Sequence, residues 1–226
     1  MSFILNIETS TTLCSVSISK NDELLALKQI DNGYTHAENL HLFINELLIQ
    51  TNLTPTHLSA VAVSKGPGSY TGLRIGVSTA KGFCFALDKP LLAVNTLEAM
   101  AFQVKDFYDD THLLCPMIDA RRMEVYCQVL DNQMNVIAET EAKIIDELSF
   151  SELLSEKKIV FFGDGAAKCQ AEITHKNAVF LNTEIHPSAK TVGLLATKSF
   201  EKSLFENVVT FEPFYLKDFV GTQKKL

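Results

Sequence analysis

The hydrophobic pattern begins with two strand-like runs. Residues 3–8 are mostly apolar, and between Cys14 and Ile18 apolar side chains alternate with serines. A period of two residues is typical of a strand with one buried face. The polar residues 9–12 join the two runs, so the pattern predicts a hairpin. A third strand is predicted over residues 23–30.

The clearest helical pattern covers residues 35–51. Its apolar residues recur at i, i+3, i+4, i+7 and i+8 and are Leu40, Phe43, Ile44, Leu47 and Leu48. Thr35 and Glu38 predict a capping box at its start. Leu42 and Ile49 lie off this stripe, one heptad apart. They are either scattered surface apolar residues or part of a subunit contact.

Residues 66–76 form a glycine-dense turn, GPGSYTGLRIG, between a strand-like run and a helix predicted over residues 71–87. Glycines at such a join allow positive φ, and the N–H groups of the first helical turn can hold an anion. Alternatively, Gly72, Gly76 and Ala80 form a smooth face for close packing of a second helix. The spacing matches neither standard phosphate-binding signature, so both interpretations stay open.

The second half of the chain repeats the plan of the first. After a strand over residues 113–119 and an alternating strand over 125–130, the pattern predicts further elements at 150–156, 158–162, 166–172 and 188–203. We therefore predict a duplicated α/β unit with subdomains 1–105 and 106–226. The last helix could instead cross over and pack on the first subdomain. The cleft between such halves usually holds a ligand.

Each predicted hairpin carries an acidic residue at the end of its first strand, Glu8 and Asp119. Two carboxylates facing a cleft could coordinate Mg²⁺ and polarise a phosphate. Alternatively, each carboxylate caps its own turn, which is the interpretation we favour for Glu8. Glu8, Thr9, Ser10 and Asp119 are thus the candidate residues of a vestigial nucleotide cleft.

Composition limits the class of protein. The chain has 226 residues, 46% of them hydrophobic, and a net charge of −7, which disfavours nucleic-acid binding by this chain alone. Its five cysteines form no C-x-x-C motif, so we expect buried free thiols. His36 and His41 are five residues apart and should not share a metal ion. Without a visible signal peptide or membrane span, we expect a cytoplasmic protein.

Three segments resemble the TsaB (YeaZ) family, which serves in tRNA threonylcarbamoyladenosine biosynthesis. They are Ile7-Glu8-Thr9-Ser10 with Cys14-Ser15-Val16, the glycine turn 66–76, and Ile118-Asp119-Ala120-Arg121 with Glu124-Val125-Tyr126. The resemblance implies an α/β, actin-like or sugar-kinase-like (ribonuclease H-like) fold with two subdomains. Family members usually have Asp where this chain has Glu8, which weakens the case for a competent nucleotide site.

The resemblance also implies a function. The family partners a related catalytic subunit, TsaD, and with the ATPase TsaE installs threonylcarbamoyl on the adenosine next to the anticodon (t6A formation). This chain would be a non-catalytic scaffold or activator that forms a homodimer when alone and meets tRNA only through the complex. It would hold no cofactor, with ATP and metal on the partner subunits. The catalytic paralogue binds metal through His-x-x-x-His, whereas Leu40 stands at that spacing from His36.

We expect the partner contact on helices 35–51 and 71–87. The predicted interface residues are Leu42, Ile49, Thr71, Gly72, Gly76, Ala80 and Phe83. A bulky residue at Gly76 should block partner binding and leave the monomer folded. The alternative function is an ATP- and Mg²⁺-dependent kinase-like phosphotransferase that uses Glu8 and Asp119. A metallopeptidase is a third hypothesis.

Overall fold

The computed structural model describes residues 1–33 and 35–217. The first half contains β1 (Phe3–Glu8), β2 (Cys14–Lys20), β3 (Glu23–Ile30), α1 (His36–Gln50), η1 (Pro55–His57), β4 (Ala60–Gly66), α2 (Tyr70–Leu87), β5 (Leu91–Asn95), α3 (Thr96–Val104) and η2 (Lys105–Phe107). The second contains β6 (His112–Asp119), β7 (Glu124–Asp131), β8 (Val136–Ile144), α4 (Ser151–Glu156), β9 (Lys158–Phe162), α5 (Ala166–Cys169), β10 (Ala178–Phe180) and α6 (Ala189–Glu201).

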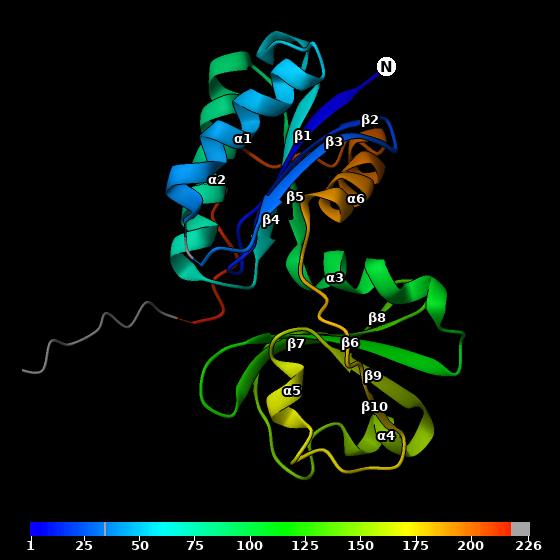
Figure 1. Ribbon diagram of the computed structural model, residues 1–226. Coiled ribbons are helices and arrows are strands. Elements are labelled where there is room, and N and C mark those ends of the chain that lie inside the picture. The colour runs from blue at the N-terminus through cyan, green and yellow to red at the C-terminus, as the bar shows by residue number, and fades with distance from the viewer. Residues whose placement is uncertain (34, 218–226) are drawn as a thin grey trace, which may run out of the picture.

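The two halves form two five-stranded sheets of the same plan (Figure 1). The first has the order β3-β2-β1-β4-β5 and the second the order β8-β7-β6-β9-β10. In each sheet the first three strands of the half pair antiparallel, and the later two join in parallel. The predicted duplication of an α/β unit is therefore confirmed, although the sequence analysis missed β5, α3, β8 and β10.

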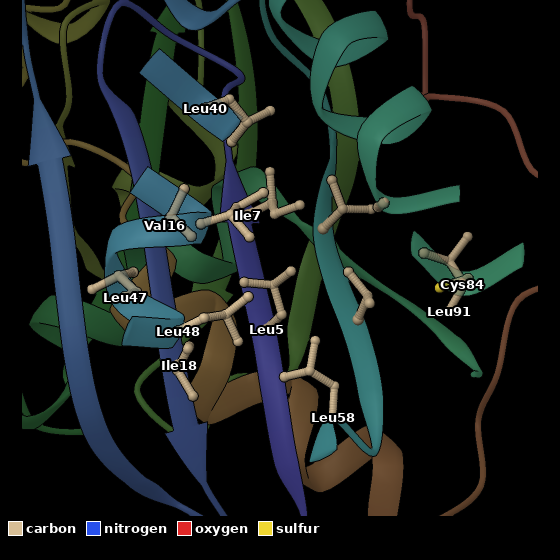
Figure 2. Close-up of a cluster of buried hydrophobic side chains, with 14 of the residues drawn as sticks. Leu5, Ile7, Val16, Ile18, Leu40, Leu47, Leu48, Leu58, Cys84 and Leu91 are labelled. Atoms are coloured by element: carbon tan, nitrogen blue, oxygen red, sulfur yellow. The ribbon is translucent and has the colours of Figure 1, made fainter. Parts of the chain in front are cut away.

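Helices cover both faces of the first sheet. α1 and α2 lie on one face and α6 lies on the other, while α3 lies between this sheet and the second one (Figure 1). Under α1 and α2, the apolar side chains of β1, β2 and β4 interlock with Leu40 and Leu47 (Figure 2). Burying one such aliphatic side chain contributes about 1.5–3 kcal/mol to the stability of the fold. This packed layer therefore holds β1, β2 and α2 in place, and with them the β1–β2 turn.

The serines of β2 do not face solvent, contrary to the half-buried strand that their alternation predicts. Ser15, Ser17 and Ser19 are all buried because α6, from the far end of the chain, covers that face. Ser15 Oγ accepts a hydrogen bond from Ala189 N at 3.1 Å, and Ser17 Oγ donates to Ala189 O at 2.9 Å. Ser15 and Ser17 are therefore satisfied by a helix that lies 172–174 residues away in the sequence, while Asn6 Nδ2 donates to Ser17 Oγ and Ser19 Oγ.

The predicted stripe of α1 is confirmed, but its predicted capping box is not. Leu40, Ile44, Leu47 and Leu48 are buried. The Thr35 side chain makes no cap hydrogen bond to the helix, and its Oγ1 instead accepts from Asn39 Nδ2 at 2.8 Å. The start of α1 is thus held through a side-chain amide rather than through Glu38.

The segment after α6 runs back along both halves. Glu206 N donates to Leu91 O in β5, and Phe214 N donates to Lys65 O at the end of β4. The Tyr215 ring stacks on Tyr70 with centroids 4.5 Å apart. Lys217 then forms an ion pair with Glu124 of β7. This C-terminal segment therefore ties the glycine turn to the hairpin of the second sheet.

Two further sequence expectations concern cysteines and membranes. All five cysteines are buried free thiols, as predicted. Within residues 1–33 and 35–217, no helix is long and apolar enough to cross a membrane.

Candidate functional site

The β1–β2 turn sits directly against the start of α2. Ser69 N donates to Ser10 O at 2.6 Å, and Thr9 Oγ1 donates to Gly72 O at 2.8 Å. From the α1 side, His36 Nε2 donates to Thr11 O at 2.8 Å. Thr9 and Ser10 are completely buried. The turn is therefore held from two helices.

The glycines of the turn and of α2 make this approach possible. A Cβ at Gly68 would overlap Ser10 O, a Cβ at Gly72 would overlap Thr9 O, and a Cβ at Gly76 would overlap Thr9 Oγ1. Ser69 caps α2, since its Oγ accepts from Gly72 N at 3.3 Å. The residues present do not fit a phosphate at this turn, because the chain itself fills the space that the glycines leave.

The close packing is confirmed, and it involves both the β1–β2 turn and a second helix. A Cβ at Gly72 or Gly76 would overlap Thr9 of the turn, and His36 of α1 also approaches Gly72. Gly72, Gly76 and Ala80 are buried within the chain, so none of the three lies on a surface that a partner could contact. A bulky residue at Gly76 would displace Thr9 of the same chain. We therefore expect such a substitution to destabilise the monomer as well, so it would not test the interface alone.

Glu8 is enclosed by its own turn. Its Oε1 accepts from Ser10 N at 2.6 Å, which is the capping role that the sequence analysis favoured. Its Oε2 has no hydrogen-bond partner among the described residues, and the same holds for the hydroxyls of Ser10 and Ser64. Burial raises the pKa of Glu8, and it outweighs the hydrogen bond from Ser10 N, which lowers this pKa. A fully buried carboxyl cannot line an open cleft for Mg²⁺.

Asp119 occupies the equivalent position in the second sheet and is half exposed. Its Oδ1 accepts from Arg121 N at 2.8 Å and forms an ion pair with Lys168. Partial burial alone would raise the pKa of Asp119, but the Lys168 ammonium and the Arg121 N–H outweigh it and hold this pKa below its ordinary value. Asp119 therefore also caps its own turn.

The sequence analysis missed a second glycine turn, Gly163-Asp164-Gly165, which follows β9. A Cβ at Gly163 would overlap Met117 O, and Gly165 N donates to that oxygen at 3.1 Å. Asp164 Oδ1 accepts from Asp119 N at 3.0 Å. Burial raises the pKa of Asp164. The detectable signal was a pair of glycines directly after the apolar run 159–162.

Three of the four remaining predicted interface residues lie outward. Leu42 and Ile49 of α1 are 59% and 67% exposed, and Thr71 is exposed at the start of α2. Phe83 is half-buried against the core of the first sheet. The sequence analysis overlooked Phe85, which is 83% exposed on α2. We call Leu42, Ile49 and Phe85 the α1/α2 apolar surface.

The sequence is similar to those of known proteins. The family model described as "TsaD: tRNA N6-adenosine threonylcarbamoyltransferase" matches residues 32–224. The TsaB protein of Bacillus subtilis is 37% identical over 54% of this chain and 52% of its own length. The matched stretch thus spans about half of that relative. The TsaB protein of Escherichia coli is 28% identical over 98% of this chain and 97% of its own length.

Solved structures identify the fold. YeaZ from Pseudomonas aeruginosa superposes with a TM-score of 0.82 at 24% identity, over 96% of this chain and all of that one. An activator of 2-hydroxyisocaproyl-CoA dehydratase from Clostridium difficile, solved with bound ADPNP, superposes with a TM-score of 0.51 at 12% identity, over 89% and 97% of the two chains. The predicted duplicated actin-like and sugar-kinase-like fold is confirmed. This chain belongs to the tRNA N6-adenosine threonylcarbamoyltransferase family and, within it, to the TsaB (YeaZ) group.

Proposed function

We propose that this protein is a non-catalytic scaffold or activator subunit in t6A formation. It would work with a TsaD-like catalytic paralogue and a TsaE-like ATPase in transferring threonylcarbamoyl to the adenosine next to the anticodon. The observation that carries the proposal is the β1–β2 turn, which fills the glycine-lined space at the start of α2. Because the β1–β2 turn fills this glycine-lined space, the chain would contribute a surface for binding a partner rather than phosphate chemistry.

The α1/α2 apolar surface supports a partner-binding role. Exposed aliphatic and aromatic side chains on two adjacent helices are typical of the core of a protein–protein interface. Leu42 and Ile49 lie on α1, and Phe85 lies on the α2 helix that contacts it. We propose that this surface contacts the catalytic paralogue in the complex and a second copy of this chain when the protein is alone.

The protein would bind no cofactor itself, and ATP and metal would reside on the partner subunits. It would meet tRNA only through the complex, consistent with a net charge of −7, and would act in the cytoplasm.

The role is tested by in vitro tRNA modification with purified partner subunits. We expect t6A to form with this protein present and to fall at least tenfold when it is omitted. Ile49→Asp or Phe85→Asp should weaken complex formation at least tenfold by calorimetry, since a charge would be buried in an apolar contact. Leu148→Asp, at a residue 70% exposed outside these helices, is the matched control and should bind normally.

Two results would overturn the proposal. One is modification of tRNA by the isolated protein, and the other is normal complex formation by both aspartate variants. Equilibrium titration with ATP and Mg²⁺ addresses the kinase-like alternative. Micromolar binding that Asp119→Ala abolishes would support that alternative instead.

A further inference from the structure

A cavity of about 430 Å³ lies away from the sites described above. It is bounded by β5, by α3 and the η2 turn that follows it, by the last turns of α6, and by the turn between β7 and β8. Its volume falls within the range of about 300–1,000 Å³ that is typical of sites for small molecules. Neither the β1–β2 turn nor the α1/α2 apolar surface contributes to its walls.

Three lysines gather at this cavity. Lys105 comes from η2, and Lys198 and Lys202 lie one helical turn apart at the end of α6. Lys105 Nζ and Lys198 Nζ lie 5.1 Å and 4.9 Å from the centroid of the Phe102 ring. The two ammonium groups are therefore no more than about 10 Å apart, a distance at which salt screens their repulsion only partly.

Acidic neighbours do not neutralise these lysines. Within the part of the chain that the structure describes, Lys198 and Lys202 form no ion pair. Lys105 pairs with Asp106, whose side chain is 82% exposed. Asp106 and the exposed Glu201 lie outside the cavity wall. Most of the positive charge at the cavity is therefore uncompensated by the protein.

Glu98 is in the wall, but its carboxyl interacts with groups elsewhere. Burial raises the pKa of Glu98, and Glu139 adds to the rise. Lys65 and Gln128 lower this pKa. None of these three neighbours lines the cavity, so the Glu98 carboxyl is engaged outside it.

Helix electrostatics explain only two of the three lysines. A cation near the C-terminal end of a helix interacts favourably with the helix dipole, which accounts for Lys198 and Lys202. It does not account for Lys105, which belongs to a different element and shares the Phe102 ring with Lys198. Two separate elements thus direct positive charge to one cavity in a chain whose net charge is −7.

We propose that this cavity binds a small phosphomonoester of about the size of a mononucleotide, with its phosphate group held by the three lysines. A phosphate dianion compensates two of the three ammonium groups, whereas a carboxylate would compensate only one. The rest of the ligand would lie against the apolar part of the wall, which includes Val94, Met134 and Leu195. The proposal goes beyond the scaffold function and does not depend on it.

The test is calorimetric titration of the full chain with AMP at low ionic strength. We expect saturable binding with a Kd of about 1 mM or tighter. Adenosine, which lacks the phosphate, and inorganic phosphate, which lacks the rest of the molecule, should each bind at least tenfold more weakly. Added salt should weaken AMP binding, because it screens the attraction between the lysines and the phosphate.

Variants separate a formed site from a general effect of charge. Lys105→Met and Lys198→Met should each weaken AMP binding at least fivefold. Ser199→Tyr should abolish it, because the larger side chain fills the cavity without changing the charge. Lys158→Met, at an exposed lysine of β9 outside the wall, is the matched control and should bind AMP normally. Thermal unfolding of each variant verifies folding.

Four results would overturn the proposal. They are the absence of saturable AMP binding, normal AMP binding by both methionine variants, binding of adenosine or inorganic phosphate as tight as that of AMP, and normal binding by Ser199→Tyr. A short oligoadenylate without a terminal phosphate serves as the last probe. Tighter binding of this RNA than of AMP would indicate a nucleic-acid surface and would likewise overturn the proposal.

Discussion

The two hairpin turns that follow β1 and β6 share their local geometry but not their surroundings. In each, a carboxylate at the end of the strand accepts a hydrogen bond from the N–H two residues later, Ser10 for Glu8 and Arg121 for Asp119. Glu8 is completely buried, while the Asp119 side chain is 48% exposed. The environment moves their pKa values in opposite directions, up for Glu8 and down for Asp119.

The two turns have different structural roles in their halves. The first turn is part of the core, because glycines of α2 let Thr9 and Ser10 approach the helix backbone. The second turn stays at the surface, with Arg121 and Arg122 at positive φ and Lys168 beside the carboxylate. Duplication therefore preserved the backbone plan, while side-chain packing made one hairpin structural and left the other accessible. Substitutions can test this contrast.

The largest loss of stability should come from disrupting the contact between the β1–β2 turn and α2. Gly72→Ala places a methyl group against the backbone oxygen of Thr9, which cannot move away without disturbing β1. We expect a loss of about 2–4 kcal/mol in the free energy of unfolding, measured by urea denaturation.

The matched control for Gly72→Ala is Gly82→Ala in the same helix. A Cβ there meets nothing within 4 Å, so alanine should stabilise the protein by about 0.5–1 kcal/mol through helix propensity. Equal effects of the two substitutions would show that the glycines matter only for helix propensity and not for the approach of Thr9.

The second prediction concerns the buried carboxyl of the first turn. Glu8→Gln keeps the acceptor for Ser10 N and removes the group whose charged form burial penalises. Because the folded pKa is raised above the unfolded value of 4.5, the folded protein binds the additional proton. The stability of the native protein should therefore fall as pH rises above that value and level off above the folded pKa.

We expect Glu8→Gln to raise the free energy of unfolding at neutral pH by about 1 kcal/mol or more and to flatten this pH dependence. Urea denaturation between pH 4 and about 8 measures both quantities. A variant that is less stable than the native protein at neutral pH would contradict the assignment of a destabilising buried carboxyl.

Periodicity allowed the hairpins, α1 and α2 to be predicted, because each buries one regular face. It did not predict β5 and α3, since residues 91–104 are apolar with no clear period, although Asn95 caps α3 through bonds to Leu97 N and Glu98 N. The small-residue face of α2 was visible in the sequence. Its partner was not, because Thr9 lies 63 residues before Gly72 and only the folded chain brings them together.

The smallest expected effect belongs to the exposed turn. Asp119→Asn removes the ion pair with Lys168 and keeps the side-chain oxygen for Arg121 N. The folded pKa of Asp119 is lowered, so its contribution to stability is present above the unfolded value of 3.8 and is lost as pH falls through the folded pKa. Because the side chain is half exposed, we expect a loss of at most about 1 kcal/mol at neutral pH, decreasing with added salt. Urea denaturation at low and high salt measures this loss. A loss as large as that of Gly72→Ala would mean that the second turn is as integral to its half as the first, and the contrast between the two hairpins would fail.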